Sequence, residues 1–270
     1  MRIVNLASGS KANSTFVHYG NTKLLIDVGL NEKQLKQRLS EIGETLSDNF
    51  SVCITHEHVD HIRGLKSLAK KYDIDFYIKR ELAESSYLSD IEFKEGRLHK
   101  IDSGKFNVGE FEVTAFDVSH DAIAPVGYIV NVFGSSAKVG FITDTGVASD
   151  QVKKCLENIK MVFIESNYDK KMLYDGKYPY IVKKRIDSEK GHLSNEQSLE
   201  LAKFLYSHGT RCFVLSHLSQ NNNTPELAYA NYLDYFQSLG LNLNQDVFLR
   251  ISFQDHNGNN FNLKEEFDGN

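Results

Sequence analysis

Six short apolar runs of this chain each end in an ionisable residue, and this regularity constrains the fold more than any other feature. The runs are KLLID, SVCITH, VTAFDVSH, KVGFITD, MVFIE and CFVLSH, which end at Asp27, His56, His120, Asp144, Glu165 and His217. In α/β folds the carboxyl ends of strands meet at one open edge of the sheet. A single acid or histidine at a strand end is usually a turn residue, but six of them predict a shared site.

Longer helical stretches alternate with these runs, so the chain is predicted to be an α/β protein. No Gly/Ser/Pro-rich linker divides it, and with only 3 prolines and 41% hydrophobic residues it can form one core. We expect a single domain over residues 1–263 and a flexible tail over residues 264–270. The closely spaced runs TFVHYG and TKLLIDVG predict an antiparallel hairpin, and hence a mixed sheet.

Several classes of protein are excluded by composition. No apolar run of 18 residues is present, so no membrane span is expected, and MRIVNLASGS lacks the pattern of a secretion signal. We therefore expect a cytoplasmic protein. Cys53, Cys155 and Cys212 are scattered, which is typical of core thiols and not of disulfides or metal ligands. A net charge of −5 means that any contact with a polyanion must be local.

The motif HEHVDH at residues 56–61 precedes a predicted helix over residues 62–72. In an extended segment residues two apart face the same way, so His56 and His58 can converge on one ion. Asp60 and His61 follow in a tight bend and can point to a neighbouring ion. Imidazole and carboxylate are ligands that Zn, Mn and Fe accept, so the motif predicts a transition-metal site.

The strand-end residues complete this site. Seven residues form two ligand sets that share a bridging carboxylate: His56, His58 and His120 for one ion, Asp60, His61 and His217 for the other, and Asp144 for both. Asp27 is expected to accept the N–H of a ligand histidine and so fix its ring plane. The nitrogen and oxygen ligands predict two divalent ions, Zn or Mn with Fe possible, without deciding among them.

The motifs T-H-E-H-V-D-H at 55–61 and TDTG at 143–146, with His120 and His217, resemble the metallo-β-lactamase superfamily. This resemblance implies an αββα sandwich, two mixed β-sheets flanked by helices, with a dinuclear site at one edge. Within the superfamily, SGSKANST, YDGKYPYIVKKRIDSEKGHLSN and LSHLSQNNNTPE resemble the bacterial YycJ/VicX (WalJ) group. That resemblance implies a DNA exonuclease acting from 5′ ends.

His192, in EKGHLSNE ahead of a predicted helix start, has no structural need to be a histidine. Two metal ions about 3.5 to 4 Å apart can hold a bridging hydroxide that attacks phosphorus, but the leaving oxygen still needs a proton. We predict that His192 donates this proton, with Glu165 holding the ring. A resemblance to the tRNA 3′-processing (RNase Z-like) branch implies the same pair. Asp60 is predicted to belong to the catalytic set as well as to the ligands.

Residues 168–191 carry seven basic and four acidic residues, with tyrosines interleaved. Basic groups can follow a phosphate backbone while aromatic rings stack on bases, which predicts a nucleic-acid partner. The family resemblance implies DNA, and RNA is possible. The expected substrate contacts are Lys183, Lys184 and Arg185, together with Ser10, Lys11 and Asn13 of an early small-residue loop. A solvated helix with tyrosines facing the core explains the basic segment equally well.

Two other functions fit the sequence. A small-molecule hydrolase of the same fold would open a cyclic phosphodiester, thioester or lactone, and its site would be a pocket closed by loops. A metal-bound regulatory protein without turnover is the second alternative, which the group's link to two-component cell-wall signalling operons favours. The sequence leaves the oligomeric state and the choice between DNA and RNA open.

Overall fold

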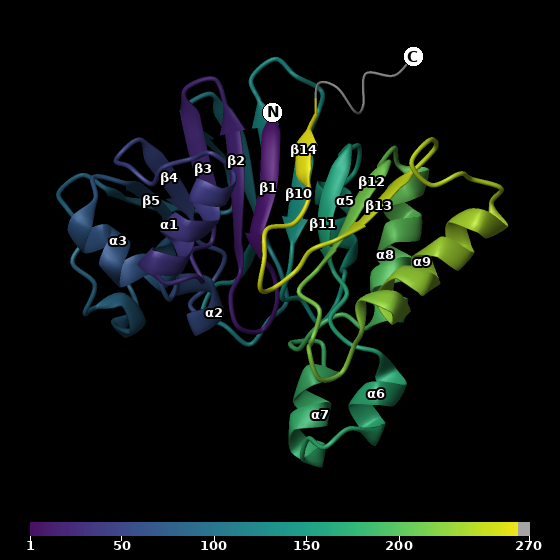
Figure 1. Ribbon diagram of the computed structural model, residues 1–270. Helices are drawn as coiled ribbons and strands as arrows, with labels where there is room; N and C mark the ends of the chain where they lie inside the picture. The colour runs from purple at the N-terminus through teal and green to yellow at the C-terminus, as the bar shows by residue number, and fades with distance from the viewer. Residues whose placement is uncertain (264–270) are drawn as a thin grey trace.

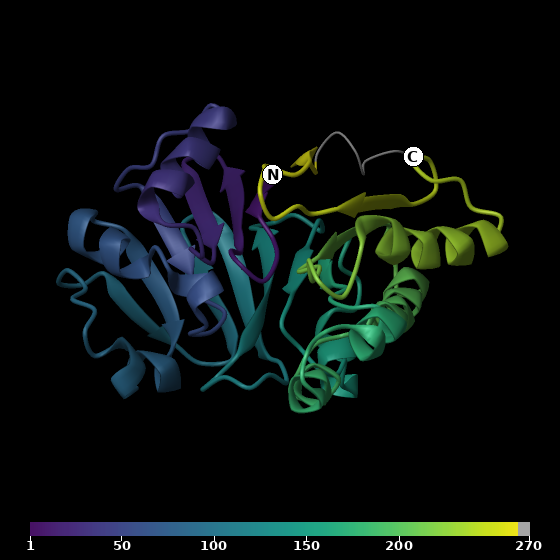
Figure 2. The same cartoon turned by 60° about the horizontal axis from the view of Figure 1, so that its bottom comes forward.

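Residues 1–263 are described by a computed structural model, so the predicted tail, residues 264–270, lies outside the described residues. Within the described part, two seven-stranded sheets face each other (Figures 1 and 2). The first has the order β14 (Asn260–Asn262), β1 (Arg2–Ala7), β2 (Ser14–Tyr19), β3 (Thr22–Ile26), β4 (Phe50–Cys53), β5 (Asp75–Lys79), β6 (Leu98–Ile101). The second has the order β13 (Phe248–Ile251), β12 (Cys212–Ser216), β11 (Met161–Glu165), β10 (Val139–Ile142), β9 (Val126–Val132), β8 (Phe111–Asp117), β7 (Gly104–Val108).

Both sheets are mixed in the same way. β1, β2 and β3 pair antiparallel and β3 to β6 pair parallel, while β7 to β10 pair antiparallel and β10 to β13 pair parallel. The predicted hairpin is β2–β3. The outer layers contain α1 (Glu32–Glu41), α2 (Val59–Ile62), α3 (Leu65–Lys71), α4 (Arg80–Ala83), η1 (Ser86–Leu88), α5 (Asp150–Cys155), α8 (Asn195–Ser207) and α9 (Pro225–Ser238). The predicted αββα sandwich is confirmed.

Alternation along the strands explains why two sheets and two helical layers form. In β3, Leu24 joins the core between the sheets, whereas Leu25 joins the core under the helices. In β12, Cys212 and Val214 join the core between the sheets, whereas Phe213 and Leu215 join the core under α8 and α9. Cys53 and Cys212 are buried as expected, while Cys155 is only partly buried at the end of α5.

Local signals set the segments that carry the site. Ser194 caps α8 with a capping box to Gln197, which fixes the chain two residues after His192. The helix predicted over residues 62–72 is interrupted: α2 ends at Ile62 and α3 begins at Leu65. Gly64 lies between them because its N–H donates to the carbonyl of Val28 (2.8 Å), where a side chain would clash. The prediction of one continuous helix was therefore wrong.

α6 (Lys170–Asp175) and α7 (Tyr180–Ile186) project from the sandwich below the lower ends of the strands (Figure 1). They lie between β11 and α8 in the chain. Among residues 1–263 no helix has the length and apolar character that crossing a membrane requires.

Candidate metal centre

The six strand-end residues lie on the same edge of the sandwich, just beyond β3, β4, β8, β10 and β12 or at the last residue of β11. Three of them have left-handed backbone: Asp27 (φ 62°), Asp144 (φ 56°) and His217 (φ 56°). A positive φ is uncommon outside glycine and recurs at functional sites. The backbone here turns sharply at the end of each strand, with the three side chains buried at this edge.

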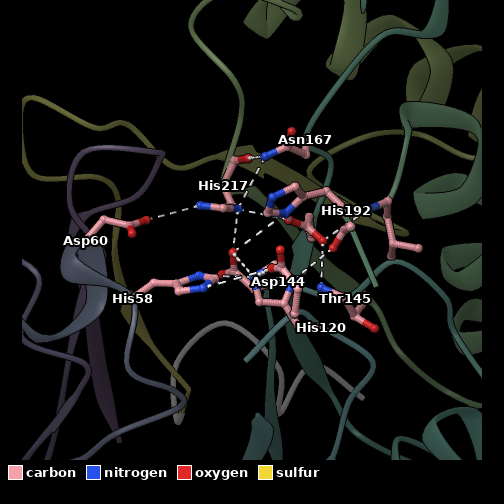
Figure 3. Close-up of polar contacts among 12 residues, drawn as sticks. His58, Asp60, His120, Asp144, Thr145, Asn167, His192 and His217 are labelled. Carbon is pink, nitrogen blue, oxygen red and sulfur yellow. Dashed lines mark hydrogen bonds and ion pairs between the residues drawn. The ribbon is translucent and has the colours of Figure 1, made fainter. Parts of the chain in front are cut away.

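The motif at residues 56–61 forms the bend expected from its spacing. His58 is the N-cap residue of α2 with extended backbone, and Asp60 and His61 follow in the first turn of this helix. Nitrogen atoms of His56, His58 and His120 lie within 4.8 Å of one another. These three imidazoles therefore form the first predicted ligand set, and Figure 3 shows His58 beside His120.

The second predicted set is also assembled. Ligand atoms of Asp60, His61 and His217 lie within 4.8 Å of one another, and the same holds for His56, His61 and Asp144. Asp144 thus lies between the two sets, as expected of a bridging residue (Figure 3). Its Oδ2 is 3.1 Å from His61 Nε2. The structure brings all seven predicted ligands together, and their roles as ligands stay predictions.

Unpartnered polar atoms show that this set of side chains suits a cation. His56 Nε2, His217 Nε2 and Asp144 Oδ2 are buried and make no hydrogen bond with any residue in 1–263, although Asp144 Oδ2 forms an ion pair with His61. Leaving a buried polar atom unsatisfied costs about 1–3 kcal/mol, so three in one cluster require an explanation. Nitrogen and carboxylate oxygen are donors that Zn, Mn and Fe accept, and the residues present therefore fit a divalent metal.

In three of the histidines a partner at Nδ1 leaves Nε2 facing the cluster. His61 Nδ1 donates to Asp27 Oδ2 (2.7 Å), and His120 Nδ1 donates to the carbonyl of Gly191 (3.0 Å). His217 Nδ1 lies 2.9 Å from Glu165 Oε1. Partners of this kind fix the tautomer and ring plane of metal-binding histidines. The contact expected of Asp27 is present.

The carboxylates of the cluster are held in their charged form. Burial opposes ionisation of Asp144, but His217 and His61 hold its pKa well below the usual range. Burial likewise opposes ionisation of Glu165, yet His192 and His217 lower its pKa to about 2. Burial would lower the pKa of His217, but Asp144 and Asp60 raise it to about 10. The cluster therefore attracts positive charge, which a divalent ion can supply in place of protons.

His192 lies beside this cluster and is held as expected. Its Nδ1 is 2.8 Å from Glu165 Oε1 and 3.6 Å from Asp144 Oδ1 (Figure 3). Glu165 Oε2 accepts the backbone N–H groups of Thr145 (3.0 Å) and Leu193 (3.1 Å). One fully buried carboxylate thus holds both His192 and the loop that carries it. The side chain of His192 is 20% exposed, so a substrate can reach it.

Three residues at the site were missed from sequence. Thr55 donates its N–H and its hydroxyl to Asp27 (both 2.8 Å). Asn167 Nδ2 donates to the carbonyl of His217 (2.8 Å), which fixes the left-handed residue. Asp121 Oδ1 is 3.4 Å from His120 Nε2. The neighbours Thr55 and Asp121 were detectable from their positions in the motifs, whereas nothing in the sequence singled out Asn167.

The early loop differs from its prediction. Asn13, expected to bind phosphate, is buried, and its Nδ2 lies 3.1 Å from Asp60 Oδ2 and 3.0 Å from His61 Nε2. Its amide is directed at the predicted ligands because Asn13 N also donates to the carbonyl of Asp60 (2.7 Å). Ser10 and Lys11 remain exposed.

The basic residues predicted to contact substrate lie on α7 and differ in their contacts. Lys183 donates to the carbonyl of Tyr174 (2.6 Å), and Lys184 lies over the rings of Tyr174 and Tyr180. Arg185 Nε donates to Asp121 Oδ2 (2.5 Å), next to the histidine cluster. The basic helix is therefore connected to the candidate site through Arg185.

A family model described as a β-lactamase superfamily domain matches residues 22–218 of the chain. The chain belongs to the β-lactamase superfamily. This member is 35% identical to the exodeoxyribonuclease WalJ of Streptococcus pneumoniae, over 89% of this chain and 90% of the relative. It is 34% identical to the exodeoxyribonuclease YycJ of Bacillus anthracis, also over 89% of this chain and 90% of the relative.

The metallo-β-lactamase fold protein YhfI from Bacillus subtilis has a similar structure. Its TM-score is 0.66 at 15% identity, and the match covers 97% of this chain and 100% of YhfI. The fold family expected from the motifs is therefore confirmed, and this family implies divalent metal ions.

Proposed function

We propose that this protein is a metal-dependent nuclease, a DNA exonuclease that cleaves from 5′ ends, with His192 as general acid. The contact between His192 and Glu165, beside a cluster of unpartnered ligand atoms, carries the proposal. The two relatives named as exodeoxyribonucleases support DNA as the substrate. Chromosomal DNA is cytoplasmic in bacteria, and we place the enzyme there.

Two divalent ions, Zn or Mn, would be held by His56, His58, His120, Asp144, Asp60, His61 and His217. When bound, they would activate a water molecule for attack and offset the charge that develops on the phosphoryl oxygens. Asp60 is assigned to catalysis because it is the most exposed carboxylate of the set, with a side chain 21% exposed. Its oxygen lies near the imidazoles of both His61 and His217 and could accept a hydrogen bond from the attacking water.

His192 would protonate the leaving oxygen. Its Nδ1 is engaged by Glu165, so Nε2 is the atom left to carry the mobile proton toward the substrate. A carboxylate partner fixes the plane of the ring, which is the arrangement a general acid needs. Because Glu165 also contacts His217, the acid and the metal ligand keep a fixed relative position.

The openness of the site favours a nuclease over a small-molecule hydrolase. The latter would need a pocket closed by loops, whereas the side chains of His58 and Asp121 at the rim are each 30% exposed. The basic helix α7 reaches this rim through Arg185. Lys183, Lys184 and Arg185 are proposed to contact the DNA backbone, with Ser10 and Lys11 as further contacts.

Replacement of His192 by alanine tests the general-acid role. We expect H192A to keep the metal content of the wild-type protein and to lose about 10²–10⁴-fold in turnover of DNA. Hydrolysis of bis(p-nitrophenyl) phosphate should fall far less, because its leaving group needs no proton. H256A, which removes an exposed histidine, is the matched control. Equal losses on both substrates would rule the role out.

A further inference from the structure

Two neighbouring apolar residues at the start of α7 are exposed to an unusual degree. Tyr180 is 67% exposed and Ile181 is 78% exposed, the two highest values among large hydrophobic residues in the described chain, 1–263. Pro179 precedes them and occupies the N-cap position of the helix. They lie at the start of α7, which projects from the sandwich (Figure 1). Exposed pairs of this kind commonly mark a binding surface.

The apolar pair lies on the same helix as Arg185, whose side chain reaches the edge of the candidate metal centre. Five residues further along the same helix, Arg185 contacts Asp121, which lies beside His120. A rise of 1.5 Å per residue places Tyr180 about 7.5 Å along the helix axis from Arg185. A ligand that reaches both the metal centre and Tyr180 must therefore be longer than a single nucleotide.

The charge around the pair identifies the kind of ligand. The segment 168–191 has a net charge of +3 in a chain of net charge −5. Two of its acids are engaged internally, since Asp169 caps α6 and Asp187 accepts the hydroxyls of Tyr168 and Tyr174. Arg185 forms an ion pair with a carboxylate, and none of the six lysines of the segment forms one within residues 1–263: Lys170, Lys171, Lys177, Lys183, Lys184 and Lys190. An anionic ligand would complement them.

The ring of Tyr180 is arranged for stacking. Lys184 Nζ lies 5.7 Å from its centroid, which adds positive charge at the ring while most of the side chain stays open to solvent. Flat bases stack on such rings in a way that tolerates any sequence, and neighbouring cations take the phosphates. A single strand with unpaired bases provides both groups at once.

We infer that Tyr180 and Ile181 form a stacking surface for the bases of a single-stranded nucleic acid whose end lies in the metal centre. This surface is part of the α6–α7 platform (residues 168–191) and binds the strand beyond the nucleotide whose bond is cut. The inference rests on the proposed nuclease function and names its substrate as a single strand longer than a few nucleotides.

A length series of substrates tests the platform. The variant Tyr180→Ala/Ile181→Ala is compared with Phe133→Ala/Leu239→Ala, which removes two exposed apolar side chains outside the platform. On oligothymidylates of ten or more nucleotides, the platform variant should show a KM about 10-fold higher with kcat unchanged. On the p-nitrophenyl ester of thymidine 5′-phosphate, both variants should match the wild type. Tyr180→Trp should keep the wild-type KM.

The other outcomes overturn the inference in distinguishable ways. A KM that does not change with strand length, or that changes equally on the one-nucleotide ester, would refute the platform. A loss of dimer in the platform variant, measured by light scattering, would assign the surface to a second copy of the chain. If the wild type cleaves no phosphodiester with any divalent metal, the proposed function fails. Fluorescence anisotropy with labelled oligothymidylate then still decides whether Tyr180 and Ile181 bind the strand.

Discussion

Asp27 sets the tautomer of His61, so changing its acidic side chain to an amide should weaken metal binding without removing a ligand. Asp27 is buried, and its Oδ2 accepts from His61 Nδ1 at 2.7 Å and from the Thr55 hydroxyl at 2.8 Å. In D27N, Oδ1 can still accept the Thr55 N–H, which leaves the amide N–H₂ facing His61. The ring must then accept at Nδ1 and carry its proton on Nε2.

That proton would occupy the atom that faces the other ligands, because His61 Nε2 is 3.1 Å from Asp144 Oδ2 and 3.5 Å from Asp60 Oδ2. Loss of a partner of this kind costs 10- to 100-fold in metal affinity, or about 1.4–2.7 kcal/mol. We expect D27N to bind Zn or Mn that much more weakly in competition with a chromogenic chelator. Its far-ultraviolet circular dichroism should match that of the wild type.

The matched control is D102N, the same chemical change at an exposed acid that follows β6 and pairs with Arg80. It should leave the metal affinity unchanged. A folded D27N protein whose affinity equals that of D102N would refute the reasoning, because the tautomer of His61 would then not depend on Asp27.

Gly29→Ala should destabilise the turn that carries Asp60 by about 1–3 kcal/mol or more, because a Cβ there would lie 1.6 Å from the carbonyl oxygen of Asp60. Urea denaturation checks this, with Gly258→Ala as control, since the nearest atom to its Cβ is 3.5 Å away. Metal removal by EDTA should lower the midpoint of thermal unfolding by about 11–22 °C, since each of the two ions stabilises by about 2.7 kcal/mol when present at 100 times its Kd. The variant D144N should lose most of this shift, and an equal shift in D144N would place the ions elsewhere.

Those parts of the site that depend on local pattern were predictable from sequence. The alternation in HEHVDH and the positions of acids and histidines at strand ends follow from the period of an extended chain and from the shared edge of a sheet. These two rules were enough to predict that His56 and His120 lie close together, although they are 64 positions apart in the sequence. The pairing of His192 with Glu165 came from elimination among strand-end acids and from the family resemblance.

The parts that depend on contacts between distant segments were not predictable. Asn13 was expected to face a phosphate, but the carbonyl of Asp60 accepts its backbone N–H and places its side chain against the ligands. The helix after the motif breaks at Gly64 because β3 is followed by a segment whose Val28 carbonyl accepts the Gly64 N–H. Neither contact can be predicted from local composition or periodicity, because the two partners lie tens of residues apart in the sequence.

The left-handed residues show how the fold stabilises a strained site. Five non-glycine residues in 1–263 have positive φ, and two of them are asparagines, which tolerate this conformation well. The other three are Asp27, Asp144 and His217, each at a strand end in the cluster. Such backbone costs about 1–3 kcal/mol per residue and persists only where surrounding contacts determine it. Those contacts are present, because Asp27 N donates to the carbonyl of Cys53 (2.9 Å) and His217 N donates to Ser8 Oγ (2.8 Å). Hydrogen bonds to the neighbouring strand β4 and to the loop after β1 therefore hold Asp27 and His217 in this conformation.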